Sequence, residues 1–168
     1  SALPTNAGII AFGSGSATFK WIGASGGSWG TVTNWDALTA IPTSVDDVIL
    51  DNSTNTNTYT VNLDGSGSTQ YSVGTLTITP NVGGGKAITL NITNTNTNGA
   101  PLTVTGTGSA LTINDAGVIT INAASGNASN GTGINMSGSG NYNFANGSSF
   151  NLQTGTGINP NSGTQTFG

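Results

Sequence analysis

Apolar side chains in this 168-residue chain occur mainly in short i, i+2 sets, with Thr, Ser or Asn between them. Alternation with a period of two is typical of β-strands that bury one face, and Gly and Asn, which favour turns, separate the sets. The sequence therefore predicts about ten short strands. The side chains predicted to face inward are Val48 and Leu50; Tyr59, Val61 and Leu63; Leu76 and Ile78; Ile88, Leu90 and Ile92; Leu102 and Val104; Leu111 and Ile113; Ile119 and Ile121; Ile134 and Met136; Tyr142 and Phe144; and Phe150 and Leu152.

The sets recur at short steps. From Leu102 to Phe150 their first members lie 9, 8, 15, 8 and 8 residues apart. A step of about eight residues holds a strand of about five residues and a turn of about three. Two or three such steps would make a coil of about 16 to 25 residues, which is in the range of repeats that form a β-solenoid.

We expect an all-β, single-domain β-solenoid, or parallel β-helix, over residues 18–168, preceded by an N-terminal arm or first strand over residues 1–17. Thr, Val and Ile favour strands and are plentiful, whereas residues that build surface helices are sparse or missing. An antiparallel β-sandwich or jelly roll would also show short strands at spacings of about 8 to 12 residues. We favour the solenoid because the steps are short, the turns are glycine-rich and the repeats are alike.

The three tryptophans, Trp21, Trp29 and Trp35, all lie near the N-terminus of a chain that otherwise stacks small side chains. Large apolar surfaces are needed where the first coil of a solenoid would otherwise be open. We therefore expect residues 18–50 to form an N-terminal cap built on these tryptophans.

Four elements of the cap segment also carry a resemblance. They are Trp21-Ile22-Gly23, Gly27-Ser28-Trp29, Asn34-Trp35, and Pro42 followed by Asp46-Asp47-Val48. Over about 31 residues this segment resembles the start of secreted bacterial β-solenoid proteins, including autotransporter-passenger-like and repeat-rich surface proteins. The resemblance implies export, a right-handed parallel β-helix and a role at the bacterial cell surface, and it implies no particular ligand or reaction.

Charge and residue types exclude several classes of function. Six Asp residues against Lys20 and Lys86 give a net charge of -4, so there is no basic surface for nucleic acid or for an anionic membrane. The longest apolar stretch, Ala7–Phe12, is too short for membrane insertion. Without His, Cys or Glu, acid–base and nucleophilic chemistry would rest on Asp, Lys and Tyr, so we expect neither an enzyme nor an obligatory cofactor.

Three weaker ligand hypotheses come from the same residues. Asp46, Asp47 and Asp51 carry carboxylates that suit calcium, although Asp also caps turns. The alternating threonines of residues 75–79 suggest an ice-binding array, although Thr is simply a good strand former. If exposed, the rings of Tyr59, Tyr71 or Trp29 would stack on sugars, which makes glycans a further candidate partner, although packing in the core or cap is the alternative for each ring.

The start of the chain and its low charge lead to a functional hypothesis. Ser1 in place of Met is typical of a chain whose signal peptide has been removed, so we expect a secreted protein. Solenoid ends present strand edges, and few charges guard them here. We expect head-to-tail self-assembly by β-augmentation into an extracellular fibre or surface filament, as in a biofilm, either coil on coil or with Ile9, Ile10 and Phe12 inserted into the next subunit. The alternative is a monomeric adhesin or carbohydrate-binding module of a bacterial surface protein.

Overall fold

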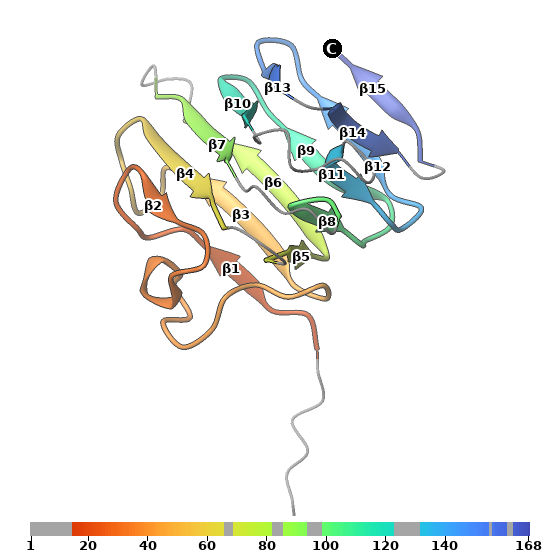
Figure 1. Cartoon of the computed structure of the whole chain (residues 1–168). Coiled ribbons are helices and arrows are strands. Elements are labelled where there is room, and N and C mark those ends of the chain that lie inside the picture. Colours follow the sequence, from red (N-terminus) through yellow and green to blue (C-terminus); the bar gives the residue numbers. More distant parts are fainter. Residues whose placement is uncertain are drawn as a thin grey trace, which may run out of the picture.

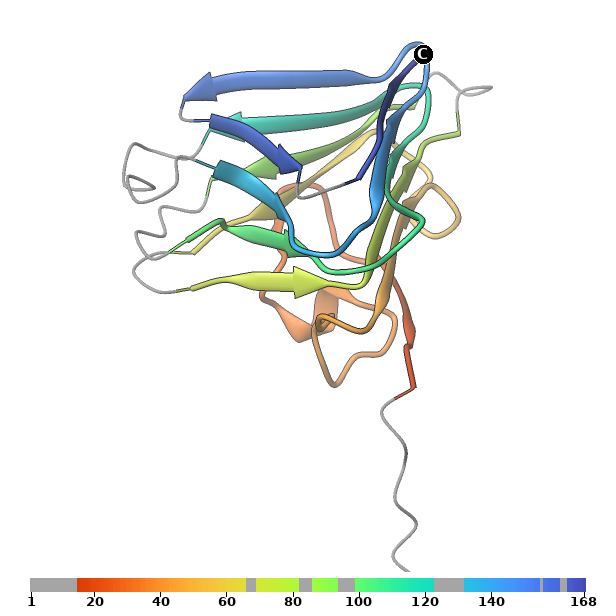
Figure 2. The same cartoon turned by 90° about the vertical axis from the view of Figure 1, so that its right-hand side faces the viewer.

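The computed structural model describes residues 15–65, 69–81, 86–93, 99–122, 132–154, 156–160 and 163–168. In these residues strands dominate, and the one helical element is a short 3-10 helix, η1 (Val32–Asn34). The strands wind into coils that stack in chain order, from red and orange at one end to blue at the other (Figures 1 and 2). Neighbouring strands in every sheet run parallel. The protein is therefore a β-solenoid, as predicted, and the sandwich and jelly-roll alternatives are wrong.

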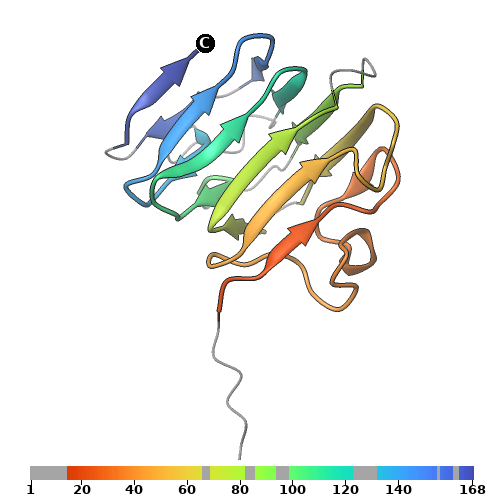
Figure 3. The ribbon, with the colours of Figure 1, turned by 180° about the vertical axis from the view of Figure 1, so that it is seen from behind.

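Three parallel sheets form the walls of the solenoid, and Figure 3 shows the largest from outside. The six-stranded sheet contains, in order, β1 (Thr18–Lys20), β3 (Asp47–Asp51), β6 (Thr75–Thr79), β9 (Ser109–Ile113), β12 (Asn141–Phe144) and β15 (Gln165–Phe167). The five-stranded sheet contains β2 (Gly27–Ser28), β4 (Tyr59–Leu63), β7 (Ile88–Ile92), β10 (Gly117–Asn122) and β13 (Ser149–Thr154). The four-stranded sheet contains β5 (Tyr71–Val73), β8 (Leu102–Val104), β11 (Thr132–Met136) and β14 (Thr156–Pro160).

Each complete coil visits the six-stranded, the five-stranded and the four-stranded sheet in turn. The register stacks one inward position of the six-stranded sheet through Val48, Leu76, Leu111, Tyr142 and Gln165. The steps between these positions are 28 (48 to 76), 35 (76 to 111), 31 (111 to 142) and 23 residues (142 to 165). The predicted coil length of 16 to 25 residues is therefore wrong for three of the four steps, because each coil has three strands and connectors of unequal length.

The core is a single apolar column enclosed by the three sheets. Along β3, β4, β6 and β7 every second residue is buried, which leaves Thr, Asn and Asp, together with Ile49, on the outer face. Each inward residue stacks on its equivalent in the next coil, as Val61 does on Leu90 and Leu90 on Ile119. The predicted inward sets are confirmed from Val48 to Ile119 and from Ile134 to Phe144, while the side chain of Ile121 lies outside the described part.

The last predicted pair differs from the others. Phe150 is only partly buried and Leu152 is 49% exposed, although both belong to β13. In the described part of the chain β13 is the outermost strand of its sheet, so its side chains lack the neighbouring coil that covers equivalent positions elsewhere. The C-terminal end of the solenoid is therefore a place where the residues depart from the repeating pattern of burial.

Candidate functional site: the two ends of the solenoid

The N-terminal end is closed by an aromatic cluster. Trp21, Trp29 and Trp35 are buried, with 0–1% of their surfaces exposed. The Trp35 ring packs edge to face against Trp21, Trp29 and Phe19, with ring centroids 5.2, 4.7 and 6.2 Å apart respectively. Such pairs each contribute about 0.5–1.5 kcal/mol beyond the burial of their area. The cluster therefore supplies this end with a densely packed plug.

Backbone hydrogen bonds hold the plug on the first coil. Trp21 and Trp35 form an isolated antiparallel bridge, and the Trp35 indole Nε1 donates to the Trp29 carbonyl at 2.9 Å. The Trp29 amide donates to the Asn62 carbonyl at 2.7 Å, which ties the cluster to β4. A Cβ at Gly23 would lie 2.7 Å from both Asn34 Oδ1 and Trp21 Cζ2, so this position needs glycine. The missing side chain of Gly23 and the backbone carbonyl of Asn62 thus allow the chain to pack closely around the rings.

Two indole groups in the cluster lack polar contacts. In the part of the chain that the structure describes, the buried Nε1 atoms of Trp21 and Trp29 have no hydrogen-bond partner. Leaving a buried donor unpaired costs about 1–3 kcal/mol. The cluster therefore stabilises this end mainly through apolar packing, with Trp35 as its hydrogen-bonded centre.

A loop takes the place of a strand at this end. The four-stranded sheet begins only at β5, and residues 29–46, orange in Figure 1, lie against it. The Trp29 and Tyr71 rings are 6.3 Å apart, and a Cβ on Gly30 would lie 2.6 Å from the Tyr71 hydroxyl. At the end of the loop, the Gly74 amide donates to the Asp46 carbonyl at 2.7 Å. The edge of the four-stranded sheet is thus covered by the chain's own loop.

The three carboxylates considered for calcium are engaged separately. The buried Asp46 accepts hydrogen bonds from the Ala17 amide at 2.9 Å, the Thr43 amide at 2.8 Å and the Thr43 hydroxyl at 2.6 Å. Burial raises the pKa of Asp46, but the bonds from Thr43 and Ala17 outweigh it and hold the pKa below its ordinary value. Asp46 therefore fastens the loop to the start of β1.

Asp47 and Asp51 sit at the two ends of β3 and have other partners. Asp47 Oδ1 accepts a bond from the Thr75 hydroxyl at 2.6 Å, and Asp51 Oδ2 pairs with Lys20 Nζ at 3.2 Å. Burial raises the pKa of Asp51, whereas bonds from Ser53 and Lys20 lower it to a net value below the ordinary one. Within the described ranges no three acidic side chains gather as they would around a metal ion. The structure thus does not bring the calcium candidates together.

The outward threonines do not form a uniform array. In the six-stranded sheet one outer column runs through Lys20, Ile49, Thr77, Thr112, Asn143 and Thr166. Threonine occupies three of these six positions, and Lys, Ile and Asn occupy the others. The regular grid that an ice-binding surface requires is therefore absent from this column.

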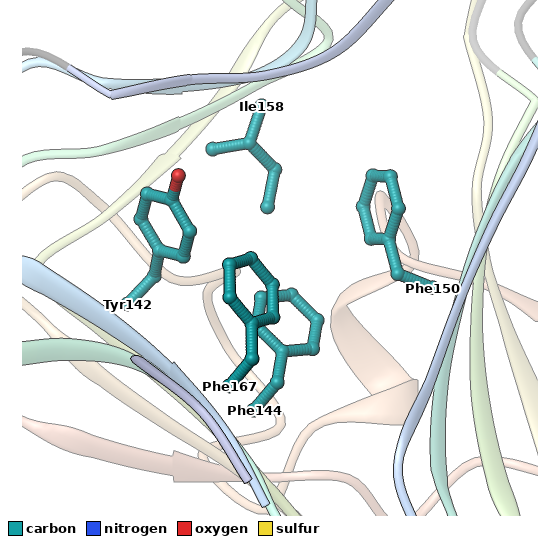
Figure 4. Close-up of a pocket in the computed structure, with 5 residues that line it drawn as sticks. All are labelled: Tyr142, Phe144, Phe150, Ile158 and Phe167. Atoms are coloured by element: carbon teal, nitrogen blue, oxygen red, sulfur yellow. The ribbon is translucent and has the colours of Figure 1, made fainter. Parts of the chain in front are cut away.

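The C-terminal end carries an apolar hollow. Its lining comes from all three sheets and consists of Tyr142, Phe144, Phe150, Ile158 and Phe167 (Figure 4). Its volume is about 170 Å³. The Phe144 and Phe167 rings are stacked at 5.5 Å, and Phe150 meets Phe144 edge to face at 5.8 Å. These rings gather as the tryptophans do at the other end, but they leave a space between them.

Three of the four strands that line the hollow are the outermost of their sheets, and the fourth, β12, is the neighbour of β15. In the described residues β13, β14 and β15 each have a partner on one side only. Phe167 in β15 is 67% exposed. None of the five lining residues is charged, and the Tyr142 hydroxyl is the one polar side-chain group among them; burial raises its pKa. The hollow is thus chemically suited to an apolar segment.

The sequence predicts strands and inward positions for three of these five residues, Tyr142, Phe144 and Phe150, but it does not predict the hollow. The alternating pattern does not include Ile158 or Phe167. The signal in the sequence is that four of the eight Phe and Tyr residues lie in the last 27 positions, from 142 to 168. The assembly residues proposed from the sequence at the N-terminus, Ile9, Ile10 and Phe12, lie outside the described residues.

Comparisons with known proteins identify no relative. No family model, no curated protein and no solved structure matches this chain. A search of the described residues for a helix long and apolar enough to cross a membrane finds none.

Proposed function

We propose that this chain is a secreted structural subunit that assembles head to tail into an extracellular filament. The observation that carries the proposal is the position of its exposed large apolar side chains. Among the described residues there are five, and all lie near the ends of the solenoid. Val32, Leu38 and Val45 belong to the N-terminal loop, while Leu152 and Phe167 belong to the last strands.

This distribution favours contact between unlike ends. Apolar surface that gathers in one place usually marks an interaction site, and here the two sites differ in shape: one is a closed loop, the other a hollow. A contact between two different surfaces of the same molecule does not close on itself, so it builds a filament when the rotation between subunits allows. Burying one Phe side chain contributes about 1.5–3 kcal/mol.

Strand edges supply the direction of assembly. All three sheets are parallel, and among the residues that the structure describes β13, β14 and β15 at the C-terminal end each lack a neighbouring strand on their outer edge. An incoming strand of a second subunit would continue a parallel ladder, which is β-augmentation. Export to the cell surface is part of the proposal because residues 20–50 resemble the start of secreted bacterial β-solenoid proteins.

The test combines variants at opposite ends. Phe167→Asp places a charge at the hollow, Leu38→Asp places one in the N-terminal loop, and Thr107→Asp, in an exposed turn midway along the solenoid, is the control. We expect the unaltered chain and the control to form filaments in electron micrographs and rapidly sedimenting species. Each end variant alone should stay monomeric, and a mixture of the two should give 1:1 dimers, because each retains one intact end.

Three results would contradict the proposal. The proposal is wrong if the unaltered chain stays monomeric at all concentrations. It is also wrong if either variant alone forms dimers through like ends, or if the mixture of the two variants fails to pair.

A carbohydrate-binding adhesin is the second candidate, and the aromatic lining of the hollow is the observation that favours it. Ligand sites of this kind join apolar walls to a few polar groups that fix orientation, and here the Tyr142 hydroxyl is the one such side-chain group in the lining. Filament assembly is therefore the better supported function. Saturable binding of an oligosaccharide to a monomeric chain, lost in Phe167→Asp, would favour the adhesin instead.

A further inference from the structure

We propose that the C-terminal hollow is filled by residues 7–12 of a second copy, with Ile10 and Phe12 facing inward and the segment paired to β14 while β1 of that copy pairs to β15. This inference rests on the proposed filament and names the parts that join. Its argument comes from the spacing of the chain.

The first step is that residues 7–12 have the spacing of a strand in the four-stranded sheet. In two of the coils an inward residue of that sheet precedes the first inward residue of the six-stranded sheet by seven or six positions, as Val104 precedes Leu111 and Met136 precedes Tyr142. Phe12 precedes Phe19, the buried residue of β1, by seven positions. Ile10 and Phe12 therefore precede the buried Phe19 of β1 by the same numbers of residues as Leu102 and Val104 precede Leu111 of β9.

The connectors repeat the same chemistry. Ser137-Gly138-Ser139-Gly140 joins β11 to β12, and Gly106-Thr107-Gly108 lies between β8 and β9. Gly13-Ser14-Gly15-Ser16 lies between Phe12 and β1. Because residues 13–16 resemble the Gly- and Ser- or Thr-rich connectors that lead from the four-stranded to the six-stranded sheet, residues 7–12 are expected to occupy a strand position of the four-stranded sheet.

The second step is that residues 7–12 have no neighbouring strand to pair with at the N-terminal end of the four-stranded sheet of their own chain, as far as the structure describes it. The position beside β5 is occupied by residues 29–46, whose Gly30 and Trp29 pack against Tyr71. A strand one coil further out would stand beside this loop, away from β5. The exposed edge of the four-stranded sheet in the described residues is that of β14.

The third step is that the segment cannot reach β14 of its own chain. The largest sheet has six strands, and the five spacings of about 4.8 Å between them place β15 about 24 Å from β1. Five residues, 13–17, lie between Phe12 and β1. Even fully extended, the chain from Phe12 to Thr18 spans about 20–22 Å, which is less than the roughly 24 Å between β1 and β15. The segment would have to pass beyond β14 to pair with its outer edge, so it cannot do so within its own chain. A second copy is therefore the occupant.

The fourth step is the fit. The hollow of about 170 Å³ is lined by Phe, Tyr and Ile, with Ile158 of β14 pointing into it (Figure 4). An apolar cavity of about 150 Å³ in another protein takes up benzene, so a space of this size suits one phenyl ring such as that of Phe12. Pairing to β14 in the same register would place Ile10 over Ile158, because Leu102 pairs with Ile134 and Ile134 pairs with Ile158. Phe12 would then lie at the next inward position, over residue 160.

The experiment uses the absence of cysteine from the sequence. Ile10→Cys and Ile158→Cys are made in separate chains, mixed and oxidised, because these two positions pair in the proposed register. Ala11→Cys replaces Ile10→Cys in the control because residue 11 faces outward in the proposed strand. We expect disulfide-linked pairs from the first mixture at a yield at least tenfold above the control. A chain carrying both Ile10→Cys and Ile158→Cys should cross-link between molecules, and a cross-link within one molecule would contradict the proposal.

A second arm separates this inference from the filament itself. Phe12→Asp should reduce the sedimenting fraction at least tenfold, whereas Ala11→Asp should leave it unchanged, with circular dichroism showing the solenoid intact in both. If Phe12→Asp still forms filaments and no cross-link appears, the filament stands and the arm is not its joint. If the unaltered chain is monomeric, the proposed function fails first.

Discussion

The two ends of this solenoid solve the same physical problem in opposite ways. At the N-terminal end three tryptophans fill the first coil and a loop covers the sheet edge, so apolar rings are buried within the chain. At the C-terminal end four aromatic rings gather around a hollow, and Phe167 is largely exposed. Aromatic side chains thus close one end and leave the other available, which gives the molecule a direction.

This difference shows that aromatic residues stabilise the fold where the chain itself buries them, and that they are available for association where no further coil covers them. The repeating middle needs neither device, because each coil covers the next with Val, Leu and Ile. We expect substitutions at the N-terminal end to change the free energy of unfolding, and those at the C-terminal end to change assembly.

The largest expected effect is at the centre of the tryptophan cluster. Trp35→Ala removes a fully buried ring that contacts Trp21, Trp29 and Phe19, so the free energy of unfolding should fall by about 3–5 kcal/mol. Urea unfolding followed by circular dichroism would measure it. A loss below about 1 kcal/mol would show that the cap is dispensable, since deletion of a packed aromatic ring costs more than that.

An intermediate effect is expected from acid at the same end. The folded-state pKa of Asp46 lies below its ordinary value of 3.8, so its ionised form stabilises the fold above that value, and this contribution is lost as pH falls toward the folded pKa. The free energy of unfolding should therefore drop below about pH 4. Asp46→Asn should flatten that part of the profile while lowering stability at pH 7 by about 1–3 kcal/mol through its weakened bonds to Thr43 and Ala17. Identical acid profiles in both proteins would assign the effect to other carboxylates.

The smallest effect on stability is expected at the open end. Phe167→Ser removes a ring that is 67% exposed, so the free energy of unfolding should change by less than about 1 kcal/mol. The binding of a hydrophobic dye by the monomer should decrease, because the hollow loses one wall. If Phe167→Ser destabilises the chain as strongly as Trp35→Ala, the contrast between the ends is wrong.

Much of the fold could be predicted because burial in a strand follows a period of two. Val48 and Leu50 or Leu76 and Ile78 identify their strands and inward faces without knowledge of any neighbour. The length of a coil could not be predicted in the same way. The step from Leu76 to Leu111 is 35 residues because its connectors are long, and nothing in the apolar pattern limits connector length.

The candidate site was harder to predict because exposure at an end depends on what lies beyond it. Leu152 shares the alternating pattern of Leu90, yet one is half exposed and the other is buried, since only Leu90 has a coil on each side. The hollow likewise needs three sheets to bring Tyr142, Phe150 and Ile158 together from separate strands. Local alternation of apolar residues predicts each strand, whereas the hollow depends on how strands from three sheets are arranged at the end of the solenoid.

The most direct test of the directional account is hydrogen exchange of the backbone amides, followed by mass spectrometry, at concentrations below and above assembly. The account predicts that peptides covering β13 to β15 and residues 7–20 gain protection on assembly, while peptides covering Trp29 and Trp35 are already protected in the monomer. Unchanged exchange in β13 to β15 across assembly would contradict it, because the open end would then take no part in joining the subunits.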